Sequence, residues 1–117
     1  MSSKPGHPSG YIDVLQSEVC AKRLKALGEP LRLRIVDVLR KGELTVGQIS
    51  DRLAAEMVTT SHHLQILKNA DLVTPRREGR FIYYRLSKYV LQKRGKSLQA
   101  LNLGCCLIEV PLPADDA

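Results

Sequence analysis

Three cysteines are the residues of this sequence best suited to bind a soft ion or to undergo redox chemistry. Cys20 lies near the N-terminus, whereas Cys105 and Cys106 are neighbours near the C-terminus. Three thiolates without a hard ligand suit a trigonal-pyramidal ion such as arsenite or antimonite, and an adjacent pair can supply two of the sulfurs. The same thiols could instead respond to oxidants or persulfides, forming a disulfide if Cys20 comes near the pair. A buried cysteine also behaves as a small apolar residue, so packing alone is a third interpretation.

Basic residues form the second group with a chemical implication. The chain has 18 Lys and Arg against 12 Asp and Glu, a formal net charge of +6. Nine of these basic residues lie between Lys68 and Lys96. Such an excess on a small domain indicates a polyanionic partner, either nucleic acid or an acidic membrane surface. With no Trp, one Phe and four Tyr, the chain offers little for stacking on single-stranded nucleic acid.

Length and composition restrict the class of protein. The 117 residues suffice for one domain, and 44% of them are apolar, which excludes a disordered charged polymer. No apolar run approaches the roughly 20 residues that span a bilayer, and Met1–Gly10 lacks the apolar centre of a signal peptide. The odd number of cysteines argues against a secreted disulfide framework, so we expect a cytoplasmic protein without a membrane partner. There is no nucleophile–base pair, glycine-rich phosphate loop or paired carboxylates, so we do not expect an enzyme. The sequence predicts no cofactor other than arsenite or antimonite as an inducer.

The elements that position these residues follow from the spacing of apolar residues and from helix breakers. Apolar residues at steps of three and four predict a helix over Tyr11–Leu27, ended by Gly28, and a second from Pro30 that stops at Gly42. Thr45 followed by Gln48 forms a capping box for a third helix through Leu53. A fourth helix is predicted from about Met57 to Ala70, with a buried stripe of Thr60, Leu64 and Leu67.

After the fourth helix, the spacing of apolar residues changes at Leu72 from a helical period of 3.6 residues to a strand period of 2. Alternation over Phe81–Leu86, next to Glu78-Gly79, predicts a β-hairpin with the charged tip Arg76–Arg80. Ser87 is predicted to cap a last helix, from Lys88 to about Leu103. The expected fold is therefore mainly α with a small β-hairpin, in the order four helices, hairpin, helix. The expected domain limits are a disordered tail at 1–10, a winged helix-turn-helix at 11–104 (helix-turn-helix about 45–70, wing 72–86), and a cysteine-pair segment with a loose tail at 105–117.

This order of elements predicts a DNA-binding protein. In a winged helix-turn-helix the second helix enters the major groove, and the hairpin follows the backbone or the minor groove. Gln can bond adenine with two hydrogen bonds, and Ser and Thr can contact bases or phosphates. We expect His62 and Lys68 to contact phosphates, and His63 to pack rather than to share a metal ion with its neighbour, because adjacent helical residues lie about 100° apart. The candidate DNA-binding residues are Thr59, Ser61, His62, Gln65, Lys68, Arg76, Arg77 and Arg80.

Several segments of the sequence resemble the ArsR/SmtB-type repressors. They are Ala26–Ile35, Gly42–Val46, Ser61–Leu64, Leu67-Lys68, Asp71–Val73 and, closest of all, the wing Arg76–Leu86. The resemblance covers about Val19 to Leu86. It implies a homodimer formed through the first and last helices, bound to double-stranded operator DNA of two-fold symmetry. It also implies repression that is relieved by a metal ion, a metalloid or a thiol oxidant.

The positions of the family's common metal sites hold no suitable ligands here. Thr45 and Gly47 stand where the family carries thiols before the recognition helix, and Ser87–Arg94 contains no Asp, Glu or His. This argues against zinc, nickel or cobalt. Because the resemblance places the first and last helices together, Cys20 could approach Cys105 and Cys106 and form with them a site for arsenite or antimonite. The sequence departs from the family at Glu56-Met57-Val58, where the family has small polar residues at the start of the recognition helix. A carboxylate at a helix start suits the helix dipole but repels phosphate.

Two other hypotheses stay open. The first is a repressor of the same fold that responds to thiol oxidation or persulfides, or that has no effector at all. The second, from another class, is a winged-helix module that binds proteins or a membrane surface rather than DNA. The exposed polar residues of the predicted recognition helix and the arginines of the hairpin favour DNA.

Overall fold

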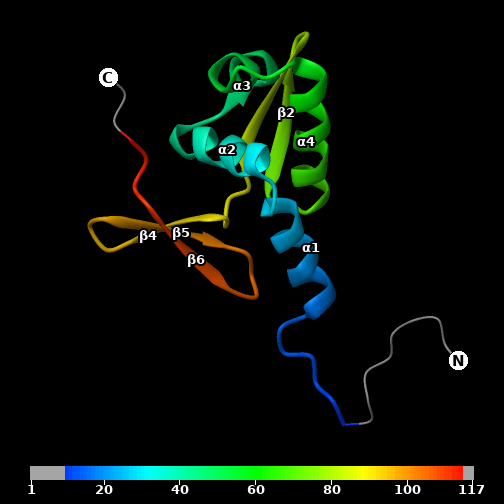
Figure 1. Cartoon of the computed structure of the whole chain (residues 1–117), viewed down its shortest axis with the longest axis vertical. Coiled ribbons are helices and arrows are strands. Elements are labelled where there is room, and N and C mark those ends of the chain that lie inside the picture. Colours follow the sequence, from blue (N-terminus) through cyan, green and yellow to red (C-terminus); the bar gives the residue numbers. More distant parts are fainter. Residues whose placement is uncertain (1–9, 115–117) are drawn as a thin grey trace, which may run out of the picture.

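The computed structural model describes residues 10–114, which form a group of helices and two small antiparallel sheets (Figure 1). The predicted tail at 1–10 lies outside the described residues except for Gly10. The elements in chain order are α1 (Ser17–Leu27), α2 (Pro30–Val38), the 3-10 turn η1 (Leu39–Lys41), β1 (Leu44–Thr45), α3 (Val46–Leu53), α4 (Met57–Asn69), β2 (Val73–Glu78), β3 (Phe81–Leu86), β4 (Leu91–Arg94), β5 (Leu98–Asn102) and β6 (Leu107–Pro111).

The helix-turn-helix forms where the sequence predicts it. Thr45 accepts a hydrogen bond from the Gln48 backbone N–H at 3.1 Å, and the Gln48 side chain accepts one from the Thr45 N–H at 2.9 Å, which confirms the capping box of α3. The stripe Thr60, Leu64 and Leu67 of α4 is fully buried. Burial of a leucine side chain of this kind contributes about 1.5–3 kcal/mol. The interior of the domain therefore fixes which face of α4 stays exposed.

The wing is also confirmed. β2 and β3 pair antiparallel, from Val73 opposite Leu86 to Glu78 opposite Phe81, and the two-residue β1 extends the sheet on the other side of β3. Gly79 has a φ of +62° in the turn at the tip, a conformation that glycine adopts without strain. Tyr84 is buried against the domain, which raises the pKa of its phenol, whereas Tyr83 on the opposite face is half-buried. The two tyrosines thus point to opposite faces, as their adjacent strand positions predict.

The predicted first helix is wrong over its first third. α1 begins at Ser17, and the preceding Gln16 has a left-handed φ of 50°. The apolar side chains that suggested a longer helix remain exposed, Ile12 at 78% and Leu15 at 59%. A helical turn in water needs a packed apolar face, and in the single chain this segment has none.

The predicted last helix from Lys88 to Leu103 is also wrong. The described residues form there a second antiparallel sheet in the order β4-β5-β6, in which Leu91 pairs with Leu101 and Ala100 with Glu109. Gly95, inside the range of the predicted helix, lies in the turn between β4 and β5 with a φ of +67°. Ser87 is a buried residue that bonds the Thr74 hydroxyl at 3.1 Å and caps no helix. Consequently Cys105 and Cys106 lie in the turn between two paired strands.

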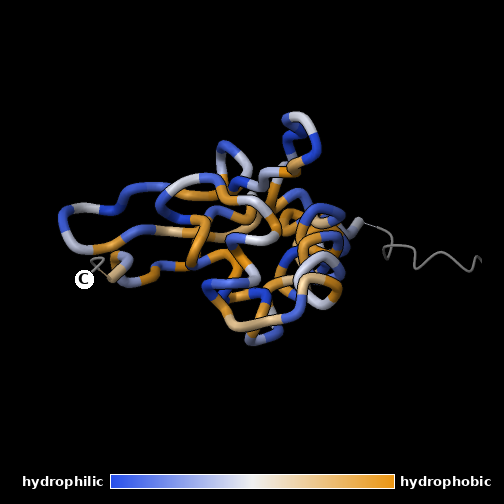
Figure 2. Tube along the Cα trace, turned by 90° about the horizontal axis from the view of Figure 1, so that it is seen from above, coloured by the Kyte–Doolittle hydropathy of each residue, from blue (hydrophilic) through white to orange (hydrophobic). Residues whose placement is uncertain are grey.

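Arg40 of η1 links the helices to the second sheet. Arg40 donates to the Gln99 side chain at 2.9 Å and to the Pro111 carbonyl at 2.5 Å. Its Nη2 also forms an ion pair with Oδ1 of Asp37 at 2.5 Å. The tip of the β4–β5 hairpin projects from the domain and is hydrophilic, whereas hydrophobic segments run through the interior (Figure 2). No helix among residues 10–114 has the length and apolarity needed to cross a bilayer.

Candidate DNA-binding surface and thiol site

The exposed face of α4 carries the polar residues that the sequence assigns to DNA. Burial of Thr60, Leu64 and Leu67 leaves the opposite side to solvent. The exposed candidates on that helix are Thr59, Ser61, His62, Gln65 and Lys68. The Gln65 side chain donates to Asn69 at 3.4 Å, a long bond that a base edge can replace. The five side chains are thus exposed together on the face of α4 that the core leaves free.

His63 differs from its neighbour His62. His62 is exposed, whereas His63 is half-buried with its Nδ1 3.0 Å from Nη1 of Arg32 on α2. The two rings lie 5.6 Å apart at an interplanar angle of 60°. This geometry agrees with a packing role for His63.

The first turn of α4 begins without a side-chain cap. Glu56 occupies the N-cap position and its carboxylate makes no capping bond. Met57 and Val58 beside it are exposed at 56% and 83%. The departure from small polar residues therefore places an acid and two apolar side chains on the surface.

The arginines of the wing are not equivalent. Arg76 forms ion pairs with Glu43, at 2.5 Å between Nη2 and Oε1, and with Glu78, and its guanidinium lies 4.7 Å from the Tyr83 ring centroid. Arg77 and Arg80 are exposed at the tip, and the guanidinium of Arg80 lies 5.4 Å from the Phe81 ring centroid. Arg77 and Arg80 thus present their charge to solvent, whereas Arg76 donates its hydrogen bonds to Glu43 and Glu78.

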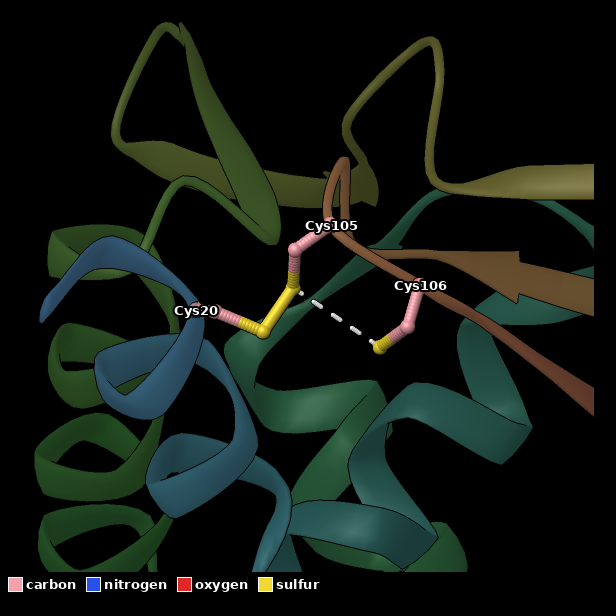
Figure 3. Close-up of side chains that lie close together, drawn as sticks. All are labelled: Cys20, Cys105 and Cys106. Carbon is pink, nitrogen blue, oxygen red and sulfur yellow. Dashed lines mark hydrogen bonds between the residues drawn. A yellow bond between two sulfur atoms is a disulfide. The ribbon is translucent and has the colours of Figure 1, made fainter. Parts of the chain in front are cut away.

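The three cysteines come together, as the sequence suggested they could. Cys20 on α1 forms a disulfide with Cys105, with 5.9 Å between their Cα atoms, and Cys106 is a free thiol 3.8 Å from the Cys105 sulfur (Figure 3). All three sulfurs lie within 4.8 Å of one another. Cys20 is buried and the other two are half-buried. The site joins residues 85 positions apart, from a helix and from a strand turn.

Sequence reasoning missed the residues that surround this site. Arg23, one turn after Cys20, donates to the Leu103 carbonyl at 2.7 Å. Gly104 has a φ of +87°, and a Cβ on it would lie 2.9 Å from Nη1 of Arg23. A pocket of about 290 Å³ lies beside the disulfide, lined by these residues and by Leu15 and Val19. The only signal in the sequence was the glycine directly before the cysteine pair.

Comparison of the sequence with known proteins points to the arsR family. The profile described as "Bacterial regulatory protein, arsR family" matches residues 29–74, which run from α2 into the first strand of the wing. The transcriptional repressor SdpR of Bacillus subtilis is 43% identical over 68 residues, which cover 58% of this chain and 76% of SdpR. The arsenical resistance operon repressor of Staphylococcus xylosus is 34% identical over 79 residues, 68% of this chain and 76% of that protein.

A solved structure supports the same relationship. The homodimeric winged helix-turn-helix DNA-binding domain Mb0332 from Mycobacterium bovis, described as a possible ArsR-family regulator, superposes with a TM-score of 0.61 at 36% identity. The match covers 68% of this chain and 76% of that domain. The fold and the sequence thus point to the same family.

Proposed function

The chain belongs to the ArsR family of bacterial DNA-binding repressors, and on this premise we propose that it is a homodimeric operator-binding repressor released by a metalloid at three thiols. The observation that carries the proposal is the meeting of Cys20, Cys105 and Cys106, with all sulfurs within 4.8 Å of one another. The resemblance to an arsenical resistance operon repressor supports it.

Operator binding is assigned to α4 and the wing. α4 enters the major groove with Thr59, Ser61 and Gln65 towards base edges, while His62 and Lys68 contact phosphates. Arg77 and Arg80 extend from the wing to the backbone or the minor groove. Arg76 contributes a weaker phosphate contact, because Glu43 and Glu78 already neutralise it.

Dimerisation is assigned to α1 and the segment before it. Val19 and Leu24 of α1 are 45% and 43% exposed, and Ile12 and Leu15 add further apolar surface. Several exposed large apolar side chains on one element favour a protein interface there. A second copy of the chain fits it, because a two-fold operator requires two recognition helices and the related M. bovis domain is homodimeric.

Arsenite binding balances as a ligand exchange. Three thiols replace the three hydroxyl groups of arsenous acid, and three water molecules leave with the thiol protons. Three sulfurs suit this soft ion, and no Asp, Glu or His belongs to the cluster of described residues. The reduced protein has all three thiols available, so the metalloid competes with disulfide formation.

A second candidate function is redox sensing. It is favoured by one observation, the disulfide between Cys20 and Cys105 with the free thiol of Cys106 beside it. Here a peroxide takes two electrons and two protons from the two thiols and is reduced to water, and a small thiol reverses the change. Either chemistry alters the same connection between α1 and the β5–β6 turn.

The test begins with DNA taken from upstream of the protein's own coding region. We expect the reduced protein to protect a two-fold symmetric site in a footprint, with affinity that falls steeply as salt rises. Equal affinity for unrelated DNA of the same length would contradict the operator assignment. Arsenite binding is measured separately by the ultraviolet absorption of arsenic–sulfur bonds. One arsenite per chain is expected, with weakened binding in Cys106→Ser.

A further inference from the structure

Arg23 lies between the thiol site and the elements that contact DNA. On one side its Nη1 donates to the Leu103 carbonyl at 2.7 Å, two residues before Cys105. The left-handed φ of Gly104 and the lack of a Cβ there leave room for this guanidinium. A movement of the cysteine turn therefore moves the acceptor of a charged, half-buried hydrogen bond.

On its other side the same guanidinium faces Asp71, which lies two residues beyond the last residue of α4. Nη2 of Arg23 lies 4.0 Å from Oδ2 of Asp71, and the guanidinium lies 5.9 Å from the ring centroid of Tyr89. The Tyr89 hydroxyl donates to the Asp71 carbonyl at 3.1 Å. Arg23, Tyr89 and Asp71 thus form one connected group.

Asp71 is placed where it affects both DNA-contacting elements. Its backbone N–H donates to the Lys68 carbonyl at 2.9 Å, which closes the C-terminal end of α4. It has a φ of 61° and lies two residues before β2 begins at Val73. A shift of Asp71 alters the direction in which α4 ends and the wing starts.

We propose that Arg23 is the positioning residue that couples the state of the three cysteines to the orientation of α4 and the wing. The inference rests on the proposed function and deepens it by naming the residue through which the thiol site acts. A ligand at the thiols shifts DNA affinity only through contacts that differ between the two states. The Arg23 contacts reach both Leu103, beside the cysteine turn, and Asp71, at the end of the recognition helix.

The test measures a release factor, the ratio of operator Kd with arsenite to operator Kd without it, for the reduced full chain. We compare wild type with Arg23→Gln, and use Lys22→Gln as the control that removes the same charge from the neighbouring, exposed position of α1. The control is expected to keep the wild-type release factor. In Arg23→Gln the factor is expected to fall by at least about fivefold, the lower end of common coupling strengths, with arsenite still bound.

A second variant tests the other end of the connection. Asp71→Asn leaves the cysteine turn untouched and tolerates the left-handed backbone. It is expected to lower the release factor as Arg23→Gln does. In wild type the Asp71 amide resonance is expected to shift on arsenite addition, and in Arg23→Gln to stay in place.

The outcomes separate the two claims. If wild type releases DNA and both variants keep its release factor, or lose affinity equally in both states, Arg23 has only a structural role and the inference is overturned. If wild type binds arsenite but keeps its operator, the proposed function fails, and the inference falls with it. A reduced factor in Asp71→Asn supports the inference even where Arg23→Gln does not fold.

Discussion

The carboxylate of Glu43, directly before β1, holds the guanidinium of Arg76 on β2, with 2.5 Å between Oε1 and Nη2. The side-chain hydrogen bonds from Arg76 hold the pKa of Glu43 below its usual value of 4.5. A carboxylate with a lowered folded pKa stabilises the protein above its unfolded pKa, and this contribution is lost as pH falls through the folded pKa. The ion pair therefore adds to the attachment of β2 at neutral pH, and this contribution is lost in acid.

This relationship predicts the titration of one carboxyl group. In the wild-type protein we expect Glu43 to titrate below 4.5, and in Arg76→Gln to return towards that value, because its main hydrogen-bond donor is gone. Carbon-detected NMR titration of the Glu43 side chain measures both. An identical Glu43 midpoint in the two proteins would show that the ion pair does not form in solution.

The wing tip supplies the next prediction. Replacing Arg80 with Ala is expected to weaken binding to all DNA sequences about equally and to reduce the slope of log K against log salt by about 0.9, the value for one lost phosphate contact. Lys96→Ala is the matched control, since Lys96 is an exposed cation in the turn between β4 and β5. This hairpin lies away from the wing (Figure 1). Fluorescence anisotropy at several salt concentrations gives both slopes. An unchanged slope for Arg80→Ala would refute the wing assignment.

A different signature is expected for the recognition helix. Gln65→Ala is predicted to cost about 1–3 kcal/mol on the preferred operator and to relax preference at one base pair, with the salt slope unchanged. Selection of operators from a randomised pool measures the preference at each position. Asn69→Ala, which removes the partner of Gln65 in the free protein, controls for loss of the local side-chain bond. An equal loss of affinity for every DNA sequence would show that Gln65 contacts the DNA backbone rather than a base.

How far the sequence predicts the fold depends on where the stabilising contacts lie. The capping box of Thr45 and the stripe around Leu64 are local signals, and both are confirmed. The period over Phe81–Leu86 likewise predicted the wing. These elements are determined by neighbours in the sequence, so the pattern suffices.

The second sheet could not be predicted in this way. Its strands depend on the pairing of Leu91 with Leu101 and of Ala100 with Glu109, and on the Arg40 contacts to Gln99. Gly95 interrupts no helix but forms the turn between β4 and β5 with a positive φ. The meeting of Cys20 with Cys105 was expected only from the resemblance, and the part of Arg23 in it left no pattern in the sequence.

The exposed face of α1 leads to a prediction about assembly. Leu24→Glu is expected to convert the dimer into monomers, because a carboxylate placed in an apolar interface loses its water without gaining a partner. Light scattering after size exclusion measures the mass. Lys22→Glu, on the same helix, controls for the added negative charge. A dimer that persists in Leu24→Glu at low micromolar concentration would assign the interface to another surface.

The most direct test of the thiol account is the titration of the reduced protein with arsenite while it holds operator DNA, followed by anisotropy. We predict release of the DNA in wild type as one arsenite binds per chain. In Cys106→Ser the DNA should stay bound at the same arsenite concentration, with unchanged operator affinity beforehand. Retention of the operator by wild type at saturating arsenite, or equal release from Cys106→Ser, would contradict the account.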